Sequence, residues 1–264
     1  MELAEEENQL AREIAEKIIR PKRSSYPPEK CTEMNTKVEG SLTLNENTPV
    51  IVCSHGNTGD KQSSCRTAAL MRNEKVAVVG FDFSGCGNSG GQYVTMGKNE
   101  INDLEDVIEH IKVKFGFKKI ALYGRSMGGG ISVMYAGRHP NDIVGVGIDA
   151  PFCSLDDFVE NFAYYYSDKA NDNVIEKVWQ IIGERIGVKK GDIVPFQEAK
   201  LASAPLYIGH GMSDRLVPIA NAEKIIAAYG SNDKKLVRFE GDHITKRPQI
   251  HLDTLREFFK RVLF

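Results

Sequence analysis

Short apolar runs alternate with helical patterns along most of this chain of 264 residues. Each run is bounded by Gly, Pro or charged residues, as buried parallel strands are. The runs that predict strands lie at residues 49–54, 76–81, 119–123, 143–148, 205–208 and 236–239. The patterns that predict helices lie at about residues 63–72, 99–115, 129–140, 219–229 and 248–262. Regular alternation of this kind predicts an α/β fold, in which helices cover both faces of a mostly parallel sheet.

The segment Gly124–Gly128 connects one predicted strand to the helix that follows it. Its pattern, G-x-S-x-G between a strand and a helix, is typical of a sharp turn that exposes a nucleophilic serine. The glycines are needed because a Cβ would collide with the neighbouring segment, and the serine takes a strained conformation. A glycine-rich turn that merely contains a serine is the plainer interpretation. The flanking strand and helix favour Ser126 as a nucleophile.

A serine hydroxyl needs a base to activate it, and the base needs a carboxylate to orient it. Among the six histidines, His243 directly follows the last predicted strand and is predicted to be the base. Asp214 follows another strand and lies between Ser126 and His243, in the chain order Ser, Asp, His. We therefore predict that Asp214 is the acid. Asp149, at the end of the strand at 143–148, is its rival.

Such a serine also needs two N–H groups that bind the oxyanion of the tetrahedral intermediate. The backbone N–H of Met127, directly after the nucleophile, is predicted to be one of them. The backbone N–H of Asn57, in the glycine-containing loop after the strand at 49–54, is predicted to be the other. Glycines at a tight turn also occur for conformational reasons alone, and both interpretations can hold together.

Residues 152–203 interrupt the alternation with two helical patterns rich in aromatic residues. An insert at this point predicts a helical lid over the site, with Phe158, Phe162 and Trp179 lining a substrate pocket. Packing of the insert onto the core is the simpler role for most of these aromatic residues. The predicted division of the chain is an N-terminal helical arm (1–29), a core (30–151 and 204–264) and the lid (152–203). A further strand or hairpin is predicted within 34–45.

The composition excludes several classes of protein. A formal net charge of −2 gives no electrostatic case for binding nucleic acid or an anionic membrane. No apolar run approaches the ~18 to 20 residues that span a bilayer, and five unpatterned cysteines fit reduced thiols in the cytoplasm. No spacing of Cys, His and Asp predicts a metal site, and the chemistry requires no cofactor. The loop at 84–91 lacks the Lys-Ser/Thr ending of a phosphate loop, so a nucleotide site is not predicted.

Five motifs together resemble the α/β-hydrolase superfamily over about residues 20–264. They are Ile19-Arg20-Pro21, Ser54-His55-Gly56-Asn57, Phe81-Asp82-Phe83-Ser84-Gly85, Gly124-Arg125-Ser126-Met127-Gly128 and Gly241-Asp242-His243. They are similar to those of an uncharacterised plant and protist branch near the serine-aminopeptidase-like hydrolases and the acyl-protein thioesterases. The resemblance implies an eight-stranded, mostly parallel sheet and a triad of Ser126, Asp214 and His243. The thioesterases carry an N-terminal cysteine cluster that is acylated, whereas the first cysteine here is Cys31, so the sequence gives no support for peripheral membrane contact through acylation.

Three functions remain open at this point. The first is a serine hydrolase that cleaves carboxylic esters or thioesters of a small-molecule or acylated substrate. The second is a peptidase, for which Asp156, Asp157 and Glu160 of the lid would bind a peptide amino terminus, although a solvated helix face is their simpler role. The third is a non-catalytic protein whose pocket binds a ligand or a partner, since this fold also hosts receptors.

Overall fold

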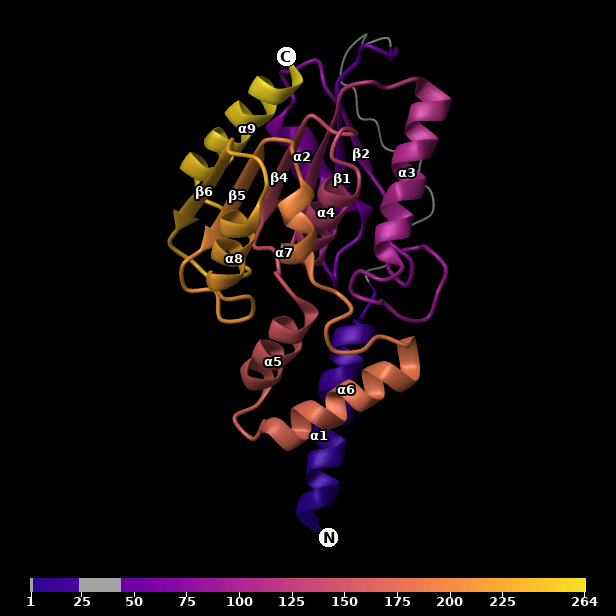
Figure 1. Cartoon of the computed structure of the whole chain (residues 1–264), viewed down its shortest axis with the longest axis vertical. Coiled ribbons are helices and arrows are strands. Elements are labelled where there is room, and N and C mark those ends of the chain that lie inside the picture. The colour runs from indigo at the N-terminus through magenta and orange to yellow at the C-terminus, as the bar shows by residue number, and fades with distance from the viewer. Residues whose placement is uncertain (1, 24–43) are drawn as a thin grey trace.

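The computed structural model describes residues 2–23 and 44–264, which form a sheet covered by helices (Figure 1). Within these residues the sheet has six strands, all parallel, in the order β2-β1-β3-β4-β5-β6. The strands are β1 (Val50–Ser54), β2 (Ala77–Gly80), β3 (Ile120–Arg125), β4 (Gly145–Asp149), β5 (Leu206–Gly211) and β6 (Lys234–Phe239). All six runs that predict strands are therefore strands. The resemblance implied two more, and the segment predicted within 34–45 falls almost entirely outside the described residues.

Helices pack on both faces of the sheet, as the alternation predicted. One face is covered by α2 (Ser64–Leu70) and α9 (Gln249–Leu263), and the other by α3 (Glu100–Phe115), α4 (Met127–Arg138) and α8 (Ala220–Ala228). Alternate residues of β1 face opposite ways, because successive strand side chains point to opposite faces. Ile51 and Cys53 pack with the side chains of α9, whereas Val50 and Val52 pack with those of α3 and α4.

The order of the strands reverses beside β1, since β2 lies on one side of it and β3 on the other. In open α/β sheets, ligands bind outside the carboxyl ends of the strands at such a reversal. The register brings the ends of three strands to one level, because Ser54 pairs with Gly124 and Arg125 pairs with Asp149. Loops that follow β1, β3 and β4 therefore start beside one another.

Three helices gather at one end of the molecule, away from the sheet (Figure 1). We call α1 (Glu2–Ile19), α5 (Leu155–Tyr166) and α6 (Asp172–Ile186) the helical cap. The long helix α1 packs along α6, and Ile14 and Ile18 of α1 and Val178 of α6 are fully buried. The predicted N-terminal helix is thus present, although Leu3, near its first turn, is 72% exposed.

Local signals explain where the cap helices begin and where the chain returns to the sheet. Ser154 accepts a hydrogen bond at 3.1 Å from the backbone N–H of Asp157 and so caps the start of α5. After α6, the short helix α7 (Pro195–Glu198) packs against α4 and is tied to it by Glu198 and Arg138, at 2.6 Å. Two 3₁₀ turns, η2 (Lys61–Ser63) and η3 (Ala199–Leu201), complete the described elements. The division of the chain into arm, core and lid stays a prediction.

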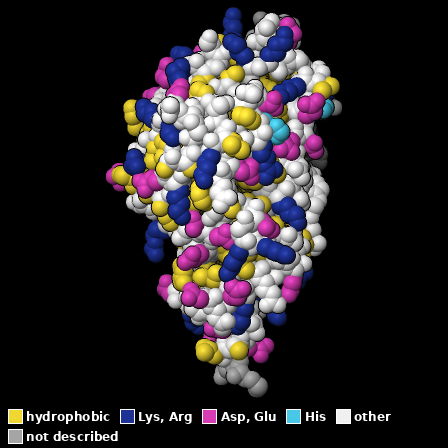
Figure 2. All heavy atoms as spheres, viewed as in Figure 1, with side chains coloured by type: hydrophobic (Ala, Val, Ile, Leu, Met, Phe, Trp, Pro, Cys, Tyr) yellow, Lys and Arg dark blue, Asp and Glu magenta, His cyan; other side chains and the backbone are white. Residues whose placement is uncertain are grey.

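The surface carries charges of both signs. On the face shown in Figure 2, acidic and basic side chains are interspersed over both the sheet end and the cap end of the molecule. No helix in the described ranges combines the length and the apolar character needed to cross a membrane.

Candidate active site

Ser126 lies on the turn between β3 and α4 with a φ of +52°. A left-handed conformation is costly for a residue with a side chain, and such strain persists only where the surroundings enforce it. Gly124 and Gly128 make the turn possible, because a Cβ on Gly124 would collide with the Gly128 carbonyl oxygen, and one on Gly128 with the Ser54 carbonyl oxygen. The Ser126 N–H donates to the carbonyl oxygen of Asp149 at 2.8 Å. The side chain is left partly exposed at the carboxyl edge of the sheet.

His243 and Asp214 lie in the loops after β6 and β5 and are hydrogen-bonded to each other. The distance from Nδ1 of His243 to Oδ2 of Asp214 is 2.7 Å. The other carboxylate oxygen of Asp214 accepts the N–H groups of Leu216 at 3.0 Å and Val217 at 2.8 Å. The Asp214 side chain is fully buried, and that of His243 is 13% exposed. Three hydrogen bonds thus hold the carboxylate, and Nε2 is the ring nitrogen of His243 that remains for proton transfer.

The Ser126 hydroxyl itself makes no hydrogen bond within the described part of the chain. Catalytic hydrogen bonds are often long in the absence of substrate and shorten when it binds. The geometry therefore joins His243 to Asp214, whereas the link from Ser126 to His243 remains a prediction.

Two arginines hold the backbone of the His243 loop. The guanidinium of Arg125 donates to the carbonyl oxygen of His243 at 2.7 Å. Arg247 donates to the same oxygen at 3.2 Å and to that of Thr245 at 2.6 Å. Both arginines face the carboxylate of Asp149, with Nε of Arg247 at 2.8 Å and Nε of Arg125 at 3.8 Å. Asp149, the rival candidate for the acid, thus binds the two arginines, and we call these three residues the arginine clamp.

The loop after β1 lies against Ser126. A Cβ on Gly56 would be 3.5 Å from Cβ of Ser126. Asn57 is anchored by its side chain, which donates from Nδ2 to the carbonyl oxygen of Ile18, in the last turn of α1, at 2.9 Å. Among the described residues, the backbone N–H groups of Asn57 and Met127 donate to no acceptor. Unpaired N–H groups in these two places are what an oxyanion hole requires.

His55 fixes the conformation of this loop. Its Nε2 accepts the backbone N–H of Phe83 at 3.1 Å, and its Nδ1 is 2.8 Å from the carbonyl oxygen of Gly56. Because Nε2 is an acceptor, the ring proton is on Nδ1 and is donated to Gly56. Burial lowers the pKa of His55, which keeps the imidazole neutral. His55 therefore supports the loop and is not placed to act as a base.

Two buried cysteines, Cys86 and Cys153, are unreactive as nucleophiles. Burial raises the pKa of the Cys86 thiol and of the Cys153 thiol to about 12, so both are protonated at neutral pH. The Cys153 thiol also faces the carboxylate of Asp157 at 3.0 Å. A search of the described residues finds no group of three or more His, Cys, Asp or Glu side chains that could bind a metal ion.

The aromatic residues predicted to line a pocket lie on α5 and α6 of the cap. Phe158 and Trp179 are each 6% exposed and belong to the hydrophobic core. The ring centroid of Phe158 is 6.2 Å from that of Phe152 and 5.7 Å from that of Phe162, which is partly exposed. Most of their surface is used for packing within the protein. Their contact with a substrate stays a prediction.

The sequence analysis did not identify the arginine clamp or the role of His55. Arg125 carried one signal, because a charged residue directly before Ser126 is unusual at the end of a buried strand. Arg247 carried none, since its position in a polar loop is that of any exposed arginine. His55 was visible only as a histidine after β1, and its tautomer follows from two contacts that need coordinates.

Comparison with known proteins supports this fold and class. The family model described as "Serine aminopeptidase, S33" matches residues 45–180, just over half of the chain. Among curated proteins, uncharacterized protein YqkD of Bacillus subtilis is 24% identical over 84% of this chain and 74% of its own length. The monoacylglycerol lipase of Mycolicibacterium smegmatis is 22% identical over 73% of this chain and 79% of its own length.

Among solved structures, the Pyrococcus furiosus esterase Pf2001 is similar with a TM-score of 0.67. The match covers 82% of this chain and 84% of the esterase, at 21% identity, and therefore supports the fold alone. The predicted superfamily is confirmed by these matches. Taken with the parallel sheet and the serine turn, they show that the chain belongs to the serine aminopeptidase S33 family of α/β-hydrolases.

Proposed function

We propose that this protein is a serine hydrolase that cleaves carboxylic esters or thioesters through an acyl-enzyme. One observation carries the proposal. The strained, partly exposed Ser126 lies at the same edge of the sheet as a buried carboxylate that is hydrogen-bonded to His243. A hydroxyl, an imidazole and a carboxylate in loops at one edge of a sheet are the groups that acyl transfer requires.

In the proposed mechanism, Oγ of Ser126 attacks the acyl carbon and Nε2 of His243 takes the hydroxyl proton. Asp214 holds Nδ1–H and stabilises the imidazolium that forms. The backbone N–H groups of Met127 and Asn57 bind the oxyanion. His243 then returns the proton to the leaving alcohol or thiol. Water, activated by the same imidazole, hydrolyses the acyl-enzyme and releases the carboxylic acid.

The arginine clamp would position the base in this mechanism. Arg125 directly precedes Ser126 and binds the carbonyl oxygen of His243, so one side chain connects the backbones of the proposed nucleophile and base. Asp149 is buried and holds the second arginine at 2.8 Å. Small displacements of catalytic groups cost large factors in rate, so the clamp should matter for turnover although it touches no reacting atom.

The ester class is supported by the relatives, among which a monoacylglycerol lipase and an esterase are named. The peptidase alternative is supported by the family's description. Its proposed anchor is largely occupied, because Asp157 pairs with Lys224 at 2.6 Å and Asp156 accepts the N–H of Gly191 at 2.9 Å. Carboxylates with these partners are poorly placed to bind a peptide amino terminus. The contacts therefore favour the hydrolysis of esters over the hydrolysis of peptides.

A panel of substrates tests the proposal. Wild-type protein and Ser126→Ala would be assayed with p-nitrophenyl acetate, butyrate and octanoate, a butyryl thioester and leucine p-nitroanilide. We expect hydrolysis of the esters and the thioester by wild type alone. Faster turnover of the anilide than of any ester would favour the peptidase, and no turnover of any substrate would favour a binding protein.

The ester series also tests whether the cap contacts the acyl chain. We expect kcat/KM to rise from acetate toward octanoate, by up to ~3-fold to 4-fold for each buried methylene at about 0.8 kcal/mol. A flat or falling series would assign the cap aromatics to packing alone.

A further inference from the structure

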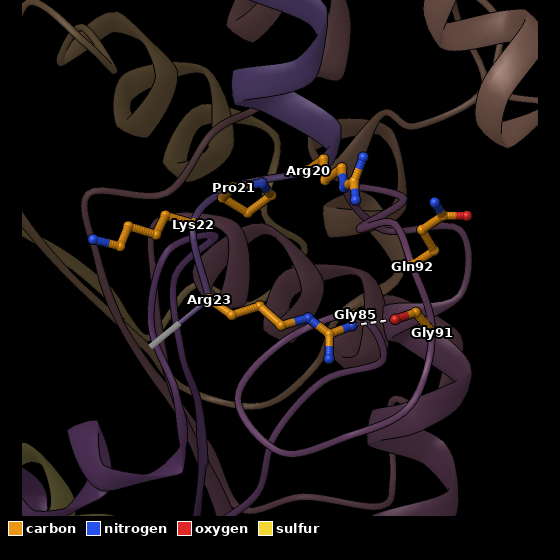
Figure 3. Close-up of a pocket in the computed structure, with 7 residues that line it drawn as sticks. All are labelled: Arg20, Pro21, Lys22, Arg23, Gly85, Gly91 and Gln92. Carbon is orange, nitrogen blue, oxygen red and sulfur yellow. Dashed lines mark hydrogen bonds between the residues drawn. The ribbon is translucent and has the colours of Figure 1, made fainter. Parts of the chain in front are cut away.

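A hollow of about 510 Å³ lies where the chain leaves α1 and passes the glycine-rich loop after β2 (Figure 3). Its lining residues come from these two segments and are Arg20, Pro21, Lys22, Arg23, Gly85, Gly91 and Gln92. Three of the seven are cations and none is acidic. The proposed hydrolysis does not use any of them.

The three cationic side chains differ in how many of their donors are already used in hydrogen bonds. The side chains of Arg20 and Lys22 make no hydrogen bond or ion pair within the described part of the chain. The guanidinium of Arg23 donates to the carbonyl oxygens of Ser89, at 3.0 Å, and Gly91. In Figure 3 the side chains of Arg20 and Arg23 border the same hollow, whereas that of Lys22 extends away from it. Two guanidinium groups therefore set the charge of the hollow.

The glycine-rich loop forms a wall of the hollow. Several of its N–H groups are used internally, since Gly85 donates to the carbonyl oxygen of Gly90 at 2.7 Å and Cys86 to that of Phe83 at 2.9 Å. The charged groups that border the hollow are the side chains of Arg20 and Arg23. The planar fork of a guanidinium matches the oxygens of carboxylates and phosphates. A phosphate has three acceptor oxygens and nearly two negative charges, so it can engage two guanidinium groups at once.

Both walls of the hollow contact the loop that carries the proposed oxyanion donor. Asn57 donates to the carbonyl oxygen of Ile18, two residues before Arg20. The thiol of Cys86, next to Gly85, is 3.8 Å from the carbonyl oxygen of Asn57. The two segments that line the hollow are therefore linked to the loop that would bind the acyl carbonyl of a substrate.

We propose that this hollow binds a phosphate group carried by the ester or thioester substrate, with Arg20 and Arg23 as its ligands. The inference rests on the proposed function for its catalytic part and extends it by naming a chemical class of substrate. The reaction is the hydrolysis proposed above. The phosphate-bearing alcohol or thiol leaves with the proton from His243, and water then supplies the second oxygen of the released carboxylic acid.

A matched pair of thioesters tests this. Butyryl-coenzyme A and S-butyryl-N-acetylcysteamine share the acyl group and the thioester and differ in the phosphates. We expect wild type to prefer butyryl-coenzyme A in kcat/KM, mainly through KM. In Arg20→Gln/Arg23→Gln this preference should fall at least about tenfold, because each charged hydrogen bond contributes roughly a factor of ten. The control Arg66→Gln, an exposed cation of α2, should keep the preference.

A binding measurement keeps the inference separate from the proposed function. Calorimetric titration of coenzyme A, and of pyrophosphate, into wild type and the double variant needs no catalysis. Weaker binding to the double variant supports the hollow as a phosphate site, even if neither thioester is hydrolysed. Absence of hydrolysis would count against the proposed hydrolase function but not against the phosphate site. Equal affinity of wild type and double variant for both probes overturns the inference, whatever the activity.

Discussion

The loops around Ser126 and the helical cap are held by different kinds of contact. At the edge of the sheet, charges that are buried or nearly so bind backbone groups, as when Asp214 accepts two N–H groups and Arg247, 10% exposed, binds the carbonyl oxygen of Thr245. In the cap, polar contacts join side chains near the surface, such as Glu7 and Lys177 at 3.0 Å. Surface pairs contribute little, whereas a buried charge that loses its partner is costly.

The difference indicates where each region is sensitive. Loop positions at the edge depend on a few polar groups, so single substitutions there should lower turnover strongly, in addition to any loss of stability. The cap depends on apolar packing of α1 against α6, so substitutions there should change stability more than turnover. Each of the following predictions tests one side of that contrast.

The largest effect is expected for Asp214→Asn. The substitution keeps the shape of the side chain, but the amide can no longer stabilise a protonated His243, so kcat should fall by about 10⁴-fold. Steady-state kinetics on p-nitrophenyl butyrate measure it. The control is Asp192→Asn, an exposed aspartate of the insert, which should match wild type. A loss of less than about tenfold for Asp214→Asn would show that another group orients the base.

The positions of the proposed catalytic residues could be predicted from sequence because strand–helix alternation determines which loops share an edge. Ser126, Asp214 and His243 were selected as residues that follow predicted strands, and all three do follow strands of the one sheet. Periodicity cannot predict pairs such as Arg247 with Asp149, because they are 98 positions apart and are brought together only by the packing of loops. The six strands could be predicted because each is a short apolar run, which is a local property of the sequence.

The cap was less predictable than the sheet. Its helices could be predicted from spacing, but nothing in the sequence indicated that α1 packs along α6 or that Asn57 binds the end of α1. The aromatic residues show the same limit, because Trp179 is buried against core residues and a helical pattern does not distinguish packing from a pocket.

In the cap, Ile14→Ala should destabilise the protein by roughly 2 to 5 kcal/mol, because Ile14 is fully buried between helices and the substitution leaves a cavity. Urea unfolding monitored by circular dichroism measures the loss. The fluorescence of Trp179, the chain's single tryptophan, reports on α6. At low urea the variant should keep kcat within about threefold of wild type. A large fall in kcat of the folded variant would contradict the separation of the two regions.

The arginine clamp should affect turnover by an intermediate amount. Arg247→Gln removes the charge that pairs with Asp149 and loosens the His243 loop, so kcat should fall by roughly 10-fold to 100-fold with little change in KM. Arg247→Lys should recover part of the loss. Arg256→Gln, at a half-exposed position of α9, serves as the control. Equal kcat in Arg247→Gln and wild type would show that the arginine clamp has only a structural role.

Mild acid should weaken the sheet rather than the cap, which contains no histidine. Burial lowers the pKa of His55, His210 and His251, so each binds protons more readily in the unfolded chain. The free energy of unfolding should therefore decrease as the pH falls below about 6.5, the ordinary histidine value. Urea titrations at pH 7.5 and 5.5 measure this. His110→Asn, an exposed position, should leave the pH dependence unchanged, whereas a stability that is equal at the two values would contradict the prediction.

The most direct test of the central claim is labelling with a fluorophosphonate, followed by mass spectrometry of the intact protein and its peptides. The probe reacts with activated serines, and Ser126 alone among the described serines lies on a strained strand-to-helix turn at a positive φ. We predict a single adduct, on the peptide that contains Ser126, and none in Ser126→Ala. Labelling that persists unchanged in Ser126→Ala, or no labelling of folded wild type, would contradict the proposal that this chain is a serine hydrolase.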